Sequence, residues 1–128
     1  MTLDASAILA ILFRERGFET LMAKVLQAQV KSVGAPTLVE TGIVLTAKLG
    51  SGAEGMIERF LQAFEIRVAE FGEANWREAC EAFLRFGRGR HPAALNFGDC
   101  LSYAAARLAG HPLLFVGKDF SRTDIDAT

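Results

Sequence analysis

Four acidic residues stand where they could do chemistry together. Asp4, Glu40, Asp99 and Asp119 each follow a short apolar segment or open a stretch of helical pattern. Their donors are all carboxylate oxygens, and no His or Cys completes a metal-ligand pattern with them. Hard oxygen ligands favour Mg²⁺ or Mn²⁺ over zinc. Such ions serve phosphoryl chemistry, because they activate a water molecule and stabilise charge on the attacking and leaving oxygens.

A simpler role is open to each acid taken alone, because helix starts commonly carry acidic and small polar residues. A carboxylate there accepts hydrogen bonds from free backbone N–H groups and interacts favourably with the helix dipole. Asp4 could cap a helix that starts at residue 5, and Asp119 could cap a short turn with Ser121. Thr37 and Glu40 have the spacing of a capping box, as do Asn96 and Asp99. Four carboxylates gathered at one place would repel one another, however, and a divalent cation would offset that repulsion.

The scaffold that would gather these acids follows from the hydrophobic pattern. Short apolar runs of strand length alternate with stretches of helical length, which indicates an α/β domain with a parallel sheet. We expect strands within residues 1–3, 32–36, 66–71 and 113–116, and helices at residues 5–13, 18–31, 37–49, 53–64, 73–86 and 98–108. Ligands of such sheets bind beyond the carboxyl ends of the strands, where all four acids would lie. Glu40 and Asp99 would each occupy the first turn of a helix.

Length and composition indicate one folded domain over residues 1–128. The chain is 51% hydrophobic with a formal net charge of −1, which excludes disorder as its main state. Its apolar stretches are far shorter than the roughly 20 residues of a membrane-spanning helix. A pI of about 6.1 indicates no overall basic surface for a polyanion. The N-terminal segment lacks the basic residues of an export signal, so we expect a cytoplasmic protein with Cys80 and Cys100 reduced and buried.

Several motifs together carry a resemblance to a known family. In chain order they are LDASA at 3–7, TLVE at 37–40, RFGRGRHPAALNFGDC at 85–100, SYA at 102–104, PLLF at 112–115 and DFSRTDI at 119–125. The third motif is the most specific. Through these motifs the chain resembles the PIN-domain ribonucleases over nearly its whole length, and among them the VapC toxins of bacterial type II toxin–antitoxin systems.

The resemblance implies a PIN-like α/β/α sandwich, with a short central parallel sheet surrounded by helices. It implies cleavage of RNA by a metal-activated water. Asp4 and Asp99 would bind the main Mg²⁺ or Mn²⁺ ion, while Glu40 and Asp119 would complete the cluster and orient the water. VapC-type toxins usually form homodimers and are held inactive by a VapB-type antitoxin, so the resemblance implies both partners here.

Three features near the last motif depart from the family pattern or extend it. Lys118 stands beside Asp119 where the family often has a small polar or acidic residue, which leaves the number of ions open at one or two. Asp124 is a fifth acid in the same motif and is expected to act indirectly or not at all. Because only three residues follow Ile125, we expect the last strand of the fold to be short or absent.

Binding of RNA would depend on local polar and positive groups, since the net charge is close to zero. The candidate substrate-binding residues near the acids are Ser6, Arg85, Arg88, Arg90, Lys118 and Arg122. Ser6 is equally well explained as a helix-start hydroxyl, and the arginine loop as a solvated surface segment. His91, which precedes Pro92, and Cys100 are better explained by structural roles than by catalysis.

Two other functions remain open from the sequence alone. A catalytically silent PIN-like module would act only through its protein partner, and a PIN nuclease could instead serve RNA maturation. The four intact acids weigh against a silent module, whereas chemistry does not separate a toxin from a maturation nuclease. Trp76 and the many phenylalanines are expected in the core, or at an interface with a second copy or a partner helix.

Overall fold

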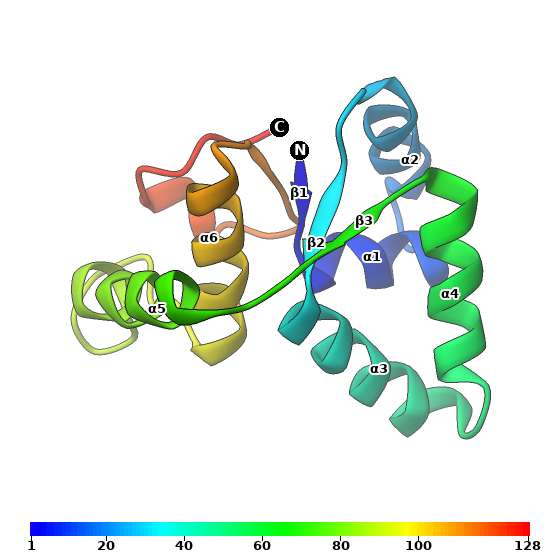
Figure 1. Cartoon of the computed structure of the whole chain (residues 1–128), viewed down its shortest axis with the longest axis horizontal. Helices are drawn as coiled ribbons and strands as arrows, with labels where there is room; N and C mark the ends of the chain where they lie inside the picture. Colours follow the sequence, from blue (N-terminus) through cyan, green and yellow to red (C-terminus); the bar gives the residue numbers. More distant parts are fainter.

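The computed structural model describes all 128 residues as a four-stranded parallel sheet between helices (Figure 1). The strands are β1 (Thr2–Leu3), β2 (Ser32–Gly34), β3 (Arg67–Ala69) and β4 (Leu113–Leu114). Their order in the sheet is β3-β2-β1-β4, so the first strand of the chain lies inside the sheet. This topology brings the N-terminal residues beside a strand formed more than a hundred residues later.

The register of the sheet depends on β1. Thr2 pairs with Ser32 of β2 on one side and with Leu113 of β4 on the other. Leu113 also forms an isolated parallel bridge with Ala127, beyond the edge of the four-stranded sheet. The last strand of the fold, expected to be short or absent, is thus reduced to this bridge.

Helices cover both faces of the sheet. Figure 1 shows α5 and α6 on one side of the strands and α1 to α4 on the other, an arrangement that confirms the expected α/β/α sandwich. The six α-helices are α1 (Ala5–Leu12), α2 (Phe18–Gln27), α3 (Ala35–Leu49), α4 (Ala53–Phe64), α5 (Glu73–Phe86) and α6 (Phe97–Ala109). A short 3₁₀ helix, η1 (Phe120–Arg122), follows β4. None of the helices combines the length and the hydropathy that crossing a lipid bilayer requires.

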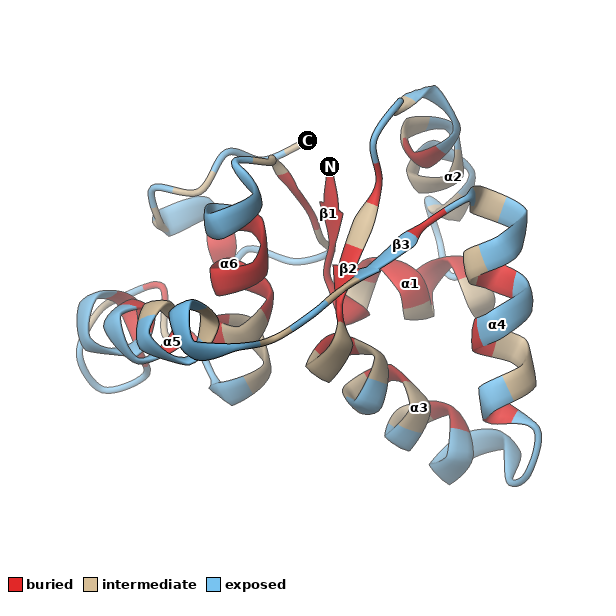
Figure 2. Cartoon of the chain, viewed as in Figure 1, coloured by how far each residue is buried: buried red, intermediate tan, exposed pale blue.

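Two hydrophobic clusters hold the layers together. One surrounds Tyr103 and Phe120 on the side of α5 and α6, and the other surrounds Ile8 on the side of α1 and α2. Leu113 belongs to the first cluster and Leu114 to the second, because successive side chains of a strand point to opposite faces. Figure 2 shows the buried residues concentrated on β1, α1 and α6.

Two helices differ from the expectation by two residues or more at one end. α2 ends at Gln27 rather than at residue 31. α3 begins at Ala35, two residues before the expected start, and Gly34 is its N-cap. Pro36 fits in the first turn because the N–H that proline lacks would have no partner within the helix.

The early start of α3 overturns the capping box expected from Thr37 to Glu40. Thr37 lies inside the first turn, and its buried hydroxyl is 3.2 Å from the Ser102 hydroxyl of α6. Glu40 is therefore in the second turn rather than the first. Its carboxylate does not reach back to the helix start, which leaves it free to point toward a neighbouring element.

The expectation of two buried cysteines is wrong for one of them. Cys100 is buried in α6, whereas Cys80 is exposed on α5. α5 packs Phe86 and small alanines against the core, and this leaves Trp76 and Phe83 47% and 42% exposed. Trp76 and Phe83 therefore lie at the surface of α5, not in the core.

Candidate functional site

The carboxyl ends of β1, β2 and β4 place four acids at one edge of the sheet. Asp4 directly follows β1, Glu40 projects from α3 after β2, and Asp119 follows β4. Asp99 joins them from the first turn of α6. The charge of Asp4 acts on both Glu40 and Asp99, and the charge of Asp119 acts on Asp99. The structure therefore brings together the four acids that the sequence nominated.

One carboxylate oxygen of Asp4 caps a helix, and the other accepts no hydrogen bond from the chain. It is 5% exposed, and its Oδ2 accepts hydrogen bonds from the Ser6 backbone N–H at 3.0 Å and the Ser6 hydroxyl at 2.5 Å. Asp4 is therefore the N-cap of α1, as its sequence position allowed. Because capping uses only Oδ2, the Oδ1 atom of Asp4 could still bind another group.

Ser6 links the first acidic motif to the last one. Its hydroxyl donates to Asp4 and accepts a 3.0 Å hydrogen bond from the backbone N–H of Val116, just after β4. This contact supports the helix-start interpretation of Ser6. It also fixes the beginning of the segment that carries Asp119 against the segment that carries Asp4.

Asp99 likewise has one oxygen in a cap, and its other oxygen accepts no hydrogen bond from the chain. Its Oδ2 accepts from the Asn96 backbone N–H at 2.9 Å, and the Asn96 side chain accepts from the Asp99 backbone N–H at 2.9 Å. This confirms the expected capping box. Burial raises the pKa of Asp99 to about 6, and the negative charges of Asp4 and Asp119 add to the rise, against the opposing effects of the Asn96 hydrogen bond and Arg88.

Glu40 reaches the site from the second turn of α3. Burial raises the pKa of Glu40, and the charges of Asp4 and Asp99 raise it further. Its carboxylate lies directly against Gly98 of α6, in the space that a Cβ at this position would fill. The contact depends on glycine, a residue that is unfavourable inside a helix. A glycine next to Asp99 was thus a signal in the sequence that the motif analysis did not use.

Asp119 is the most loosely held of the four acids. It is exposed, and its side chain does not cap the 3₁₀ helix that follows. The expected turn of Asp119 with Ser121 is therefore wrong, because the Ser121 hydroxyl donates to the Lys118 carbonyl at 2.5 Å. The position of the Asp119 carboxylate is therefore set by the backbone around it and not by side-chain hydrogen bonds.

The donor set of this edge fits a hard divalent cation. All four side chains supply carboxylate oxygens, and their mutual repulsion would be relieved by positive charge. The side chains as they stand do not form a group of three or more ligands close enough to hold one ion. Holding one ion would therefore require these side chains to move closer together.

Comparison with known proteins decides the family. The PIN domain model matches residues 1–126. The chain belongs to the PIN-domain family. A VapC ribonuclease of Mycobacterium bovis and the ribonuclease VapC36 of Mycobacterium tuberculosis are each 44% identical to it over 127 residues, which cover 98% of this chain and 91% of each relative. The ribonuclease VapC of Mycolicibacterium smegmatis is 35% identical, over 99% of this chain and 98% of the relative.

Solved structures share the fold of this PIN domain. VapC20 of Mycobacterium tuberculosis, a toxin that cleaves the sarcin–ricin loop, aligns with a TM-score of 0.79 at 19% identity, over 99% of this chain and 97% of its own. A chain of a toxin–antitoxin complex from Klebsiella pneumoniae aligns with a TM-score of 0.72 at 12% identity, over 99% and 95% of the two chains. These likenesses confirm the PIN-like architecture.

The basic candidates divide into two groups in this PIN domain. Arg88 is close enough to Asp99 to lower its pKa, and Arg90, Lys118 and Arg122 are exposed on the flanking loops. Arg85 has a different partner: its guanidinium forms a 2.8 Å salt bridge with Asp124. The structure does not bring Arg85 into the candidate site.

We expect Asp99→Asn to raise the melting temperature of the metal-free protein by a few degrees at neutral pH, because the substitution removes a repelled charge and keeps an oxygen for the cap. Native Asp99 has a pKa of about 6 against an ordinary value of 3.8. The native state therefore keeps a proton that the unfolded state has lost between these values, so stability falls as pH rises through about 4 to 6.

Thermal melts of both proteins from pH 4 to 8, with and without Mg²⁺ or Mn²⁺, check this expectation. The wild type should gain melting temperature on addition of the metal, and the variant should gain less. Equal metal-free stability and equal metal response in the two proteins would contradict a shared carboxylate site.

We expect Gly98→Ala to displace the Glu40 carboxylate and to lower RNA cleavage by about tenfold or more, because small displacements of reacting groups have large effects on rate. Gly72→Ala is the matched control, since a Cβ at Gly72 meets no atom within 4 Å. Cleavage rates and circular dichroism spectra of the two variants make the comparison. Full activity in a folded Gly98→Ala protein would mean that Glu40 does not need this contact.

Proposed function

We propose that Asp4, Glu40, Asp99 and Asp119 are the catalytic centre of this PIN domain, a VapC-type toxin endoribonuclease. The proposal is that they hold Mg²⁺ or Mn²⁺ and hydrolyse phosphodiester bonds of RNA. The observation that carries it is the meeting of four carboxylates from separate segments at one sheet edge, where burial, and then the charge of neighbouring acids, raises the pKa of Glu40 and of Asp99. We further propose that the enzyme acts in the cytoplasm, where cellular RNA is accessible.

The proposed reaction is attack of water on phosphorus, with cleavage of the bond to one ribose oxygen. A bound Mg²⁺ or Mn²⁺ would lower the pKa of the attacking water and stabilise charge on the attacking and leaving oxygens. Asp4 and Asp99 would hold it, since each has one oxygen outside its helix cap. Glu40 and Asp119 orient the water, and the raised pKa of Glu40 suits it to accept the proton.

Contact with RNA would come from exposed positive groups beside the acids. Arg88, Arg90, Lys118 and Arg122 lie on the loops that precede α6 and follow β4. Arginine and lysine bind phosphate by charge-assisted hydrogen bonds, which position the backbone of a nucleic acid without reading its sequence. Arg85 is left out of this group because Asp124 already binds its guanidinium.

The decisive experiment is cleavage of total cellular RNA by the purified, antitoxin-free protein with Mg²⁺, with Mn²⁺ and with a chelator. Asp4→Asn and Asp99→Asn should each lower metal-dependent cleavage on the order of 100-fold or more, as loss of a charge-stabilising group typically does. Asp126→Asn is the control, because Asp126 is an exposed acid outside the site.

The pattern across the four proteins separates the alternatives. Cleavage by the wild type and Asp126→Asn alone would support the acidic centre, and sequencing of the cut ends would identify the target RNA. Equal cleavage by all four proteins would indicate a contaminating nuclease. No cleavage by any of them would favour the silent module or a substrate absent from the RNA pool.

A homodimer is the assembly that the exposed apolar surface favours. Trp76 of α5, Phe97 of α6 and Ile43 of α3 are 47%, 81% and 65% exposed, and they line or border a groove of about 790 Å³ between these helices. Apolar surface of this extent on a small domain is typical of an interface. The groove also includes Glu40, so the dimer would place two acidic sites near one another.

A VapB-type antitoxin is the second proposed partner. Folds like this one occur in toxin–antitoxin complexes from Klebsiella pneumoniae and Rickettsia felis. A second apolar groove between α3 and α4, lined by Leu38, Ile57 and Leu61 among others, would suit the apolar face of an amphipathic helix. The neighbouring acids would then attract a basic side chain of the same segment.

We expect Trp76→Glu to weaken the homodimer at least about tenfold, because it buries a charge in the proposed interface. Leu26→Glu is the matched control, since Leu26 is 63% exposed on α2, outside the groove. Light scattering across a dilution series measures the dissociation constant of each protein. Equal dimerisation of both variants would place the interface elsewhere.

A further inference from the structure

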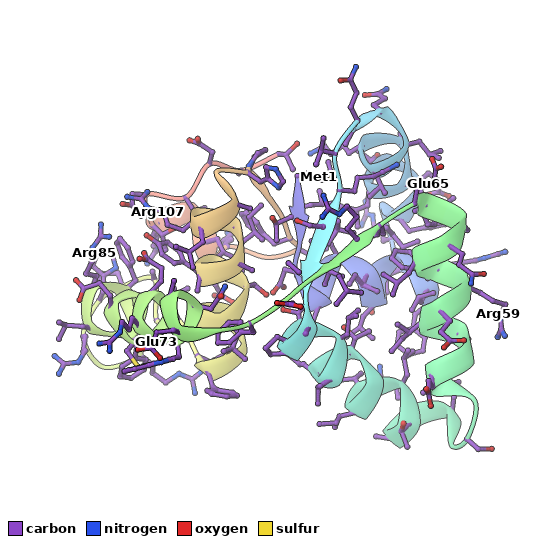
Figure 3. All side chains as sticks on the ribbon, viewed as in Figure 1. Met1, Arg59, Glu65, Glu73, Arg85 and Arg107 are labelled. Carbon is purple, nitrogen blue, oxygen red and sulfur yellow. The ribbon has the colours of Figure 1, made fainter.

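Asp124 is the centre of a polar network away from the four acids. Its Oδ1 accepts a 2.6 Å hydrogen bond from the hydroxyl of Tyr103, a residue fully buried in α6. Its Oδ2 binds Arg85 of α5 at 2.8 Å and lies 3.6 Å from Arg107 of α6. Figure 3 labels both arginines, on the side of the molecule formed by α5 and α6.

Two of the three partners of Asp124, Tyr103 and Arg85, are themselves held by the core residue Phe86. The Tyr103 ring packs against Phe86 in the core, and the Arg85 guanidinium lies 4.6 Å from the centre of the same Phe86 ring. Burial and the nearby carboxylate raise the pKa of Tyr103 to about 12, so its hydroxyl stays protonated and donates to Asp124. The hydrogen bonds and the arginine charges lower the pKa of Asp124, which therefore remains ionised.

The segment that this network holds is the one that carries Asp119. Between the two acids, Phe120 is buried in the core, and the Thr123 hydroxyl donates to the Phe120 carbonyl at 2.7 Å. At the other end of the segment, Ser6 accepts the hydrogen bond from Val116. Asp119 has no side-chain hydrogen bond of its own, so the anchors on either side determine where its carboxylate lies.

We propose that Asp124 is a positioning residue, which holds the segment after β4 against α5 and α6 and thereby sets the place of Asp119 in the acidic site. The inference rests on the proposed function only in taking Asp119 as a metal-holding residue. It assigns the fifth acid a role that requires no contact with metal or RNA. It also gives Arg85 a structural partner in place of a phosphate.

The test is a double-mutant cycle on Mn²⁺ binding, with the free ion counted by electron paramagnetic resonance and no RNA present. The proteins are wild type, Asp124→Asn, Asp119→Asn and the double variant, with Asp126→Asn as the control. We expect Asp124→Asn to weaken Mn²⁺ binding about tenfold, within the range typical of groups that orient metal ligands. In the Asp119→Asn background the same substitution should have almost no effect, because the positioned group is already gone.

Hydrogen exchange of the metal-free proteins supplies a second readout. Asp124→Asn should speed exchange in residues 117–124 and leave α1 and α3 unchanged. Equal weakening of Mn²⁺ binding by Asp124→Asn in both backgrounds would overturn the proposal, because it would indicate general loss of stability. Unchanged binding in Asp124→Asn, or in Asp119→Asn, would overturn it as well.

The outcome is separable from that of the proposed function. A cycle with the expected coupling in a protein that cleaves no RNA would support the positioning role while the ribonuclease proposal fails. Metal-dependent cleavage together with uncoupled Mn²⁺ binding would leave the ribonuclease proposal intact and overturn the role of Asp124.

Discussion

Repulsion among four carboxylates is the interaction on which the properties of this site depend. A parallel sheet collects side chains at the carboxyl ends of its strands, and here those side chains carry like charges. Local bonds hold two of them in place without neutralising them: Asp4 caps α1, and Asp99 caps α6. Burial raises the pKa of Glu40 and of Asp99, and the repulsion of the neighbouring acids raises both further. A site of this kind favours a proton or a cation, and its chemistry follows from that preference.

Helix capping and the proposed metal binding are compatible roles for Asp4 and Asp99. The capping interpretation assumed that a carboxylate bound to backbone N–H groups is fully used. In Asp4 and Asp99 the cap occupies Oδ2 only, and the second oxygen is left for the site. In the proposed metal site, the cap would therefore orient the ligand, much as an outer hydrogen bond does.

The sequence predicted the layers, the strand positions and the four acids, because these depend on hydrophobic periodicity and on local spacing. The predictions were wrong where tertiary contacts determine a helix start, a side-chain partner or an exposed face. The start of α3 depends on how Gly34 leaves the sheet, so the turn that holds Glu40 was placed wrongly. Arg85 was assigned to RNA because it is near Asp99 in sequence, whereas its partner Asp124 lies 39 residues further on. Exposure of Cys80 likewise reflects which face of α5 meets α6, a choice that periodicity alone leaves open.

The hydrogen bond from Val116 to Ser6 joins residues 110 positions apart in the chain. During synthesis on the ribosome, the segment with Asp4 emerges long before β4 exists to pair with β1. Until then β1 lacks one neighbour, Asp4 lacks the backbone that carries Asp119, and the acidic edge is incomplete. The proposed catalytic centre would thus stay incomplete in a nascent chain until β4 and Asp119 have left the exit tunnel.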